Sequence, residues 1–259
     1  MKATRSAPID ASPINRPESG RSVGSRIVGR VLLFFLFFVI IRFLTEAFFA
    51  ALTLFSAPHV PEKIYDFLVI EEGGEIVDLS GNWQAIVTGI SFAFAACLLR
   101  GKSLEYSRKY SPSEKKSPLF ILLSCIASVA LALALNLLIV KTGIAASSAA
   151  YQEVAVSQYS CAFLIGILVY GIISPLSEEL LFRGIVFNGV KGFMGWKPSL
   201  FLTSVLFAVY HGNGVQGIYA LVMSLLITFM YEKSGSLLIP VLMHASANIA
   251  SYILTYLLN

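Results

Sequence analysis

Charged residues are scarce in this chain. Asp, Glu, Lys and Arg supply 13% of its 259 residues, whereas 56% are hydrophobic and the mean hydropathy is +0.76. A soluble domain carries about 25% charged residues, so the composition excludes an ordinary soluble fold and predicts an integral membrane protein. The net charge of +4 reflects a bias between loops and gives no case for nucleic-acid binding.

Cysteine is also rare. Cys97, Cys125 and Cys161 lie singly inside apolar segments and show neither disulfide pairing nor metal-ligand spacing. We interpret them as packing residues. The sequence therefore predicts neither a disulfide framework nor a cysteine-based metal site.

Long apolar stretches are abundant instead. Five of them lack Asp, Glu, Lys and Arg (79–99, 117–140, 154–177, 198–231 and 234–259), and another apolar run covers 27–55. A helix needs roughly 20 residues to cross a hydrocarbon core. The stretch 198–231 is long enough for two short helices, with Gly212, Asn213 and Gly214 as the turn. The sequence predicts an all-α, polytopic bundle of about seven spanning helices.

Basic residues set the expected orientation. Lys and Arg are concentrated in the N-terminal segment and in the loop 100–116, whereas the loop 62–78 is acidic. Cytoplasmic loops carry the Lys/Arg excess, so we expect a multi-pass protein with a cytoplasmic N-terminus. Its short loops suit a bacterial inner (plasma) membrane.

Composition divides the chain into three parts. Residues 1–26 are rich in Ser, Pro, Arg and Gly and predict a disordered cytoplasmic tail. Residues 27–116 hold the first transmembrane helices with their acidic and basic loops. Residues 117–259 form the predicted catalytic bundle, because every motif lies there. The first apolar run is too long for a signal peptide, so we expect an uncleaved helix.

A pair of glutamates followed by an arginine interrupts the apolar background. On a helix, Glu179 and Arg183 share a face in the order that favours an ion pair, while Glu178 points about 100° away. Glu179 can therefore be held by the arginine while Glu178 stays available as a general base. The alternative is a helix that ends at the interface, with its charges among headgroups.

Two histidines lie in similar apolar surroundings. His211 follows Phe207 by four residues, and Asn248 follows His244 by four, so each pair lies along one helix face. A lone histidine of this kind is more often a hydrogen-bonded core residue. Two histidines with an Asn and a double Glu favour a hydrolytic site, since imidazole and carboxamide groups can stabilise an oxyanion.

Prolines precede two of these motifs. Pro175 and Pro240 lie three and four residues before Glu178 and His244. Each can kink its helix and free a backbone carbonyl, and a broken helix at membrane depth typically lines a wet cavity. We expect the polar tips to converge within about 10 Å on one such cavity. Because basic loops flank the motif helices, we expect its mouth on the cytoplasmic side.

The motifs EExxxR, FxxxH and HxxxN, in this order on successive hydrophobic helices, resemble those of the CPBP (Abi) family, which includes the CAAX prenyl endopeptidases. They span about 174–251, and no motif residue departs from the pattern. The resemblance implies a helical intramembrane protease. In it, Glu178 and His211 activate water, and His244 and Asn248 hold the oxyanion. The structural or substrate-positioning partners are Glu179, Arg183 and Phe207.

Metal dependence stays open on the residues alone. Two His and one Glu are a known catalytic zinc set, but the HExxH arrangement is absent and the ligands would come from three helices. Asn248 and Arg183 also fit an oxyanion or substrate role better than a zinc shell. We favour a glutamic-type mechanism with neither metal nor cofactor, and a zinc-dependent version of the same protease is the alternative.

Other classes of function remain in view. The predicted endopeptidase acts on a membrane-associated peptide or protein substrate in the lipid bilayer, and the sequence does not say whether that substrate is prenylated. A non-proteolytic membrane scaffold or immunity protein is one alternative. A proton-coupled transporter is another, although we find no inverted repeat of the kind that transporters often show. Arg42 and Glu46, four residues apart in the first helix, are interpreted as an ion pair without a catalytic role.

Overall fold

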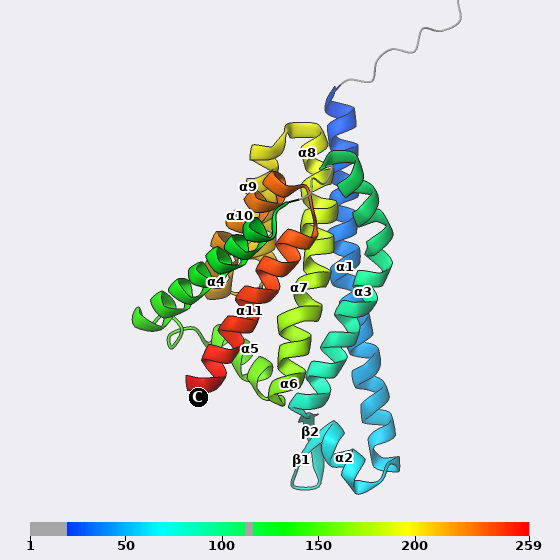
Figure 1. Ribbon diagram of the computed structural model, residues 1–259. Helices are drawn as coiled ribbons and strands as arrows, with labels where there is room; N and C mark the ends of the chain where they lie inside the picture. Colours follow the sequence, from blue (N-terminus) through cyan, green and yellow to red (C-terminus); the bar gives the residue numbers. More distant parts are fainter. Residues whose placement is uncertain (1–19, 112–115, 259) are drawn as a thin grey trace, which may run out of the picture.

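The computed structural model describes residues 20–111 and 116–258, and helices dominate it (Figure 1). Within these residues, six helices are long and apolar enough to cross a membrane. Five of them are α1 (Gly20–Ser56), α3 (Gly81–Tyr110), α4 (Pro118–Lys141), α10 (Gly214–Ser234) and α11 (Leu238–Leu258). The all-α, polytopic bundle is confirmed, with one long helix fewer than the seven expected.

The missing span is α9 (Trp196–Tyr210), which has only 15 residues. At 1.5 Å per residue it is about 22 Å long, short of a hydrocarbon core of about 30 Å. The chain turns back at the predicted break: Gly212 has a positive φ of 74°, which glycine adopts without strain. The Asn213 side chain then caps α10 by accepting from Gln216 N at 2.9 Å.

The sixth span is one continuous helix of 32 residues, 163–194. It runs through α6 (Phe163–Gly166), the π-helix η2 (Ile167–Ile173), α7 (Ser174–Glu179), the π-helix η3 (Leu180–Phe187) and α8 (Asn188–Met194). Backbone hydrogen bonds in π-helices join residues five apart, and such segments are frequent at functional sites. Neither π-helix was predicted from the sequence.

This helix starts later and ends later than the apolar stretch 154–177 predicted. The preceding α5 (Ala149–Tyr159) is a separate short helix. The chain breaks after Tyr159, and the Asn82 side chain on α3 accepts from Ala162 N at 2.7 Å. A side chain from a distant helix thus satisfies a backbone group at the break, and no local pattern signals this.

The acidic loop also folds. It forms a short 3-10 turn, η1 (Ala57–His59), then α2 (Glu62–Leu68), and an antiparallel hairpin of β1 (Val69–Glu72) and β2 (Glu75–Leu79). Gly73 and Gly74 turn the hairpin with positive φ values of 63° and 85°. Figure 1 shows this hairpin at the end of the bundle opposite the start of α1.

The prediction that residues 1–26 form a disordered tail is wrong for residues 20–26, because α1 begins at Gly20. A helix that is already nucleated extends readily, since each further residue adds a backbone hydrogen bond. Residues 1–19 of that predicted tail lie outside the described residues.

One hydrophobic core joins the first helices to the motif helices. Its buried side chains include Phe38 of α1, Leu99 of α3, Phe182 of η3 and Phe207 of α9. A Cβ on Gly184 would lie 1.7 Å from an atom of the Ser103 side chain, so glycine lets η3 approach α3 closely, as small residues do between membrane helices. A second core packs α4, α10 and α11 together.

Candidate active site

Glu178 and Glu179 lie at the end of α7, in the middle of the helix 163–194, and are only 5% and 0% exposed. Arg183, one turn later, is 0% exposed. The interfacial alternative is therefore wrong, since these charges are enclosed by protein and not placed at a helix end. Buried charges of this kind need close partners.

Arg183 has such partners on two helices. Its NH1 group pairs with Glu179 Oε1 at 2.7 Å, in the i,i+4 geometry that the sequence predicts. Its NH2 and Nε groups donate to Ser224 Oγ at 2.9 Å and to Thr228 Oγ1 at 3.2 Å, both on α10. The guanidinium also lies 5.0 Å from the centre of the Phe207 ring. Arg183 therefore links the helix that carries Glu178 and Glu179 to α9 and α10.

His244 on α11 completes this buried cluster. Its Nδ1 lies 2.8 Å from Glu179 Oε1, and its Nε2 lies 3.9 Å from Glu178 Oε2. Glu179, paired with Arg183, is the acceptor, so Nδ1 donates and Nε2 faces Glu178. The sequence predicted the Glu179–Arg183 pair but not its third member, because 65 positions separate Glu179 from His244.

Glu179 has one further feature. Its second oxygen, Oε2, is buried and has no hydrogen-bond partner among the residues that the structure describes. Both Arg183 and His244 contact Oε1. The carboxylate therefore acts through a single oxygen.

His211 lies at the turn after α9, where its Nδ1 donates to the Phe207 carbonyl at 2.8 Å. A carbonyl can only accept, so this bond assigns the proton to Nδ1 and leaves the lone pair of Nε2 free in the neutral ring. The Phe207 ring packs edge-on against both histidines, at 4.8 Å from His211 and 5.7 Å from His244. Phe207 thus separates and orients the two imidazoles.

Asn248 is held by the π-helix η2. In η2, Ser174 N bonds the Val169 carbonyl five residues back, and the next residue, Pro175, has no N–H. The Tyr170 carbonyl therefore lacks a helical partner and accepts from Asn248 Nδ2 at 3.0 Å. The proline frees a carbonyl as the sequence predicts, and a motif residue uses it.

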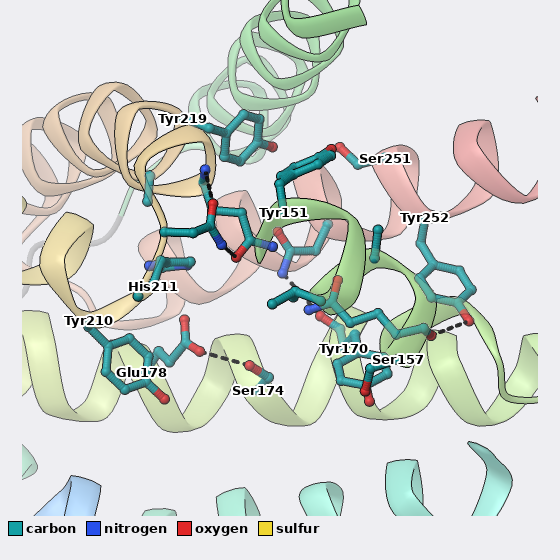
Figure 2. A pocket seen from close by; sticks show the side chains of 18 of the residues that line it. Tyr151, Ser157, Tyr170, Ser174, Glu178, Tyr210, His211, Tyr219, Ser251 and Tyr252 are labelled. Carbon is teal, nitrogen blue, oxygen red and sulfur yellow. Dashed lines mark hydrogen bonds between the residues drawn. The ribbon is translucent and has the colours of Figure 1, made fainter. Parts of the chain in front are cut away.

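These residues meet at one cavity of about 770 Å³, shown in Figure 2. Glu178, His211, His244, Asn248 and Phe207 all line it, whereas Glu179 and Arg183 lie behind its wall. Ser174 Oγ donates to Glu178 Oε1 at 2.8 Å. Ser174 was missed, although it precedes Glu178 by four residues and so shares its helix face.

Part of the cavity wall lies at the end of the bundle that carries the acidic hairpin. This part comes from α5, from the start of α3 and from the last turns of α11, which all lie at that end in Figure 1. The mouth expected on the cytoplasmic side stays a prediction.

Arg42 also reaches this cavity. It pairs with Glu46 at 2.8 Å, as interpreted from the sequence, but it also donates to Ser91 Oγ at 3.2 Å and to the Tyr210 hydroxyl. Its guanidinium lies 3.4 Å from the centre of the Phe92 ring. The link to Tyr210, the neighbour of His211, was missed because Arg42 and Tyr210 are 168 positions apart in the sequence.

The residues do not form a recognisable metal centre. Across the described part of the chain, no three His, Cys, Asp or Glu side chains lie together in a way that could hold a metal ion. The zinc set of Glu178, His211 and His244 is therefore not among the groups that the described residues bring together.

Comparisons with known proteins support the motif resemblance. Residues 160–250 match the family model described as Type II CAAX prenyl endopeptidase Rce1-like. The chain is 37% identical over 82 residues to UPF0177 protein YxdF of Lactococcus lactis subsp. lactis (strain IL1403), which covers 31% of this chain and 45% of that protein. It is 34% identical over 90 residues to an uncharacterized 24.3 kDa protein of Escherichia coli, covering 32% and 41%.

The chain thus spans less than half the length of these curated relatives. No solved structure matches it. The family match covers all three motifs, from Glu178 to Asn248. The resemblance that the motifs indicate is thereby confirmed over residues 160–250, which are similar to the Rce1-like family.

Proposed function

We propose that this protein is an intramembrane endopeptidase that hydrolyses peptide bonds with a water activated by Glu178. The observation that carries the proposal is the meeting of Glu178, His211, His244 and Asn248, from two helices and a turn, at one cavity. Ionisable groups buried among membrane helices are costly and mark functional interiors. The family match supports protease chemistry.

The first step needs a base beside the attacking water. Ser174 holds Oε1 of Glu178, so Oε2 is the oxygen that accepts the proton. The water oxygen forms a bond to the peptide carbonyl carbon, and the carbonyl electron pair moves to its oxygen. The free Nε2 lone pair of His211 accepts a hydrogen bond from the same water and orients it. Such general-base catalysis contributes about 10²–10⁴-fold.

The resulting oxyanion needs hydrogen-bond donors. His244 can donate from Nε2 when both ring nitrogens carry a proton, with Nδ1 donating to the Glu179 carboxylate. Asn248 has a second N–H beyond the one bound to Tyr170. When the intermediate collapses, the C–N bond breaks and the proton on Glu178 passes to the leaving amine. Glu179 and Arg183 act as positioning residues in this scheme.

The substrate is a membrane-associated peptide or protein. The description of the matched family names a CAAX prenyl endopeptidase, so a prenylated peptide is the first substrate to test. We place the chain in a bacterial inner membrane with a cytoplasmic N-terminus, because the N-terminal segment and the loop 100–116 are basic. In that orientation, the end of the bundle that carries the acidic hairpin faces away from the cytoplasm.

A cleavage assay tests the proposal. Purified protein in nanodiscs is incubated with quenched fluorescent peptides, both prenylated and unmodified, and with a Glu178→Gln variant as the matched control. Cleavage by the wild type, lost in the variant, supports the proposal. Absence of cleavage across the peptides, or equal cleavage by the variant, contradicts it. Binding without cleavage would instead favour the scaffold or immunity alternative.

A further inference from the structure

The cavity is rich in carboxamide side chains. Six Asn and Gln residues line the whole cavity: Gln84, Asn136, Gln158, Asn213, Gln216 and Asn248. They come from α3, α4, α5, the turn before α10, α10 and α11. Each carboxamide offers two N–H donors and one acceptor oxygen. Polar groups of this kind are costly at membrane depth unless they have partners.

Several of these groups have no partner within the described residues. Gln216 Oε1 accepts from Asn213 Nδ2 at 2.7 Å, but its Nε2 donors are free. Gln84 is bonded only through Oε1, by Ser157 at 3.3 Å. The Gln158 side chain makes no hydrogen bond in this part of the molecule, although its backbone carbonyl accepts from Tyr252. The amide N–H groups of these three glutamines thus have no partner in the described residues, and they line the same cavity as Glu178.

Tyrosines continue the same wall. Figure 2 shows Tyr151, Tyr170, Tyr210, Tyr219 and Tyr252 around the cavity. Burial raises the pKa of the Tyr151 phenol, so its O–H stays protonated and can donate. Tyrosine combines an apolar face with one polar tip, which suits a chain that presents both side chains and polar main-chain groups.

Another part of the cavity lining is different. Beside the motif residues, the cavity wall includes the apolar side chains of Phe92, Phe207, Ala220, Met223 and Ile227. We call this apolar part of the lining the inner end, and the part formed by the carboxamides and tyrosines the outer wall.

We infer that the outer wall binds the main chain of an extended, unlipidated peptide segment, whose apolar side chain next to the cleaved bond enters the inner end. The inference rests on the proposed function. Every residue of an extended chain brings one N–H and one C=O that must be satisfied when it leaves water. Free carboxamides supply partners for those groups from several helices, whatever the side chains of the peptide are.

A prenyl chain fits this wall poorly. It carries no hydrogen-bonding group, so it would cover the free amides of Gln84, Gln158 and Gln216 and remove their access to water. Buried polar groups without partners are destabilising. The prenyl group of a modified peptide would have to remain outside the cavity, in the bilayer.

The test compares matched peptides and matched variants. Full-length protein in nanodiscs is assayed with one apolar-centred peptide of about ten residues, unmodified or carrying an S-farnesyl cysteine. The Gln158→Leu variant removes an amide that makes no hydrogen bond within the described residues, and Gln216→Leu removes a second amide. We expect the unmodified peptide to be cleaved at least as efficiently as the farnesylated one. Each variant should raise KM about 2- to 10-fold, as loss of one hydrogen bond predicts, with kcat within about twofold.

Gln152→Leu is the control, since Gln152 is exposed on α5 and bonds only the Ala146 carbonyl; its KM should not change. Cleavage of the farnesylated peptide alone would overturn the inference and leave the proposed function intact. Unchanged KM in both Gln158→Leu and Gln216→Leu would also overturn it. Absence of cleavage of either peptide would overturn both proposals together.

Discussion

Glu179 is the site of a perturbation whose effect can be worked out from the structure. Glu179→Gln keeps the oxygen that meets Arg183 and His244 and puts an amide in place of Oε2, which has no partner in the described residues. The change therefore removes charge with little change of shape. It leaves the guanidinium of Arg183, 0% exposed, without its counter-ion. Breaking a buried pair in this way costs about 3–5 kcal/mol.

A double variant separates charge from shape. Glu179→Gln with Arg183→Met removes both charges, so the two changes should be less than additive, with a coupling free energy of about 2–3 kcal/mol. Glu105→Gln is the matched control, because its pair with Lys102 is exposed, at 59% and 34% of the side chains. Exposed pairs contribute at most about 1 kcal/mol.

The assay is reversible unfolding in mixed micelles, followed by circular dichroism, beside the peptide-cleavage assay. Stability should recover in the double variant relative to the sum of the single changes, but turnover should not. The reason is that in both variants the His244 ring faces a neutral amide in place of the Glu179 carboxylate. Loss of one oxyanion donor costs about 10²–10³-fold in kcat. Additivity within about 0.5 kcal/mol, or full turnover in Glu179→Gln, would refute the reasoning.

Three further predictions follow from the same cluster. Glu178→Gln should keep the fold but lower turnover about 10²–10⁴-fold; cleavage rates measure this, and retention of more than about a third of the activity contradicts the assignment. Asn248→Ala should lower kcat and also destabilise the helix 163–194, because the Tyr170 carbonyl loses its partner; kinetics and thermal unfolding report the two effects, and an unchanged unfolding temperature would argue against the contact. Dialysis against a strong chelator should leave turnover unchanged, with elemental analysis finding less than one zinc per chain; inactivation that added zinc reverses would favour the zinc-dependent alternative.

Several features follow from local sequence alone. The apolar stretches predicted the membrane helices, because a run of about 20 apolar residues has no favourable place except a bilayer or a large core. The spacing of Glu179 and Arg183 predicted their ion pair, since residues four apart meet on a helix. The turn at Gly212 was predicted for a similar reason: two glycines around an asparagine favour a backbone conformation that few other residues adopt.

The sequence predicted the candidate residues of the site but not the contacts between them. The residue types and their order indicated a hydrolytic constellation, and the structure brings Glu178, His211, His244 and Asn248 to one cavity. Which nitrogen of each histidine is engaged could not be inferred. The bonds from His244 to Glu179 and from Asn248 to Tyr170 span 65 and 78 positions, and no spacing rule reaches so far.

Sequence by itself thus determined the class of molecule, its apolar helices, its ion pair and the candidate residues of its site, because these depend on composition and on neighbours within a turn or two. Tertiary structure decided what depends on helix packing. The break before Ala162 depends on a side chain of α3, and the His244 contact depends on α11 lying beside α7. The position of His211 at the cavity depends on α9 ending at Tyr210. Such features arise between helices, where the free energy comes from burial and hydrogen bonds among residues that are distant in the chain.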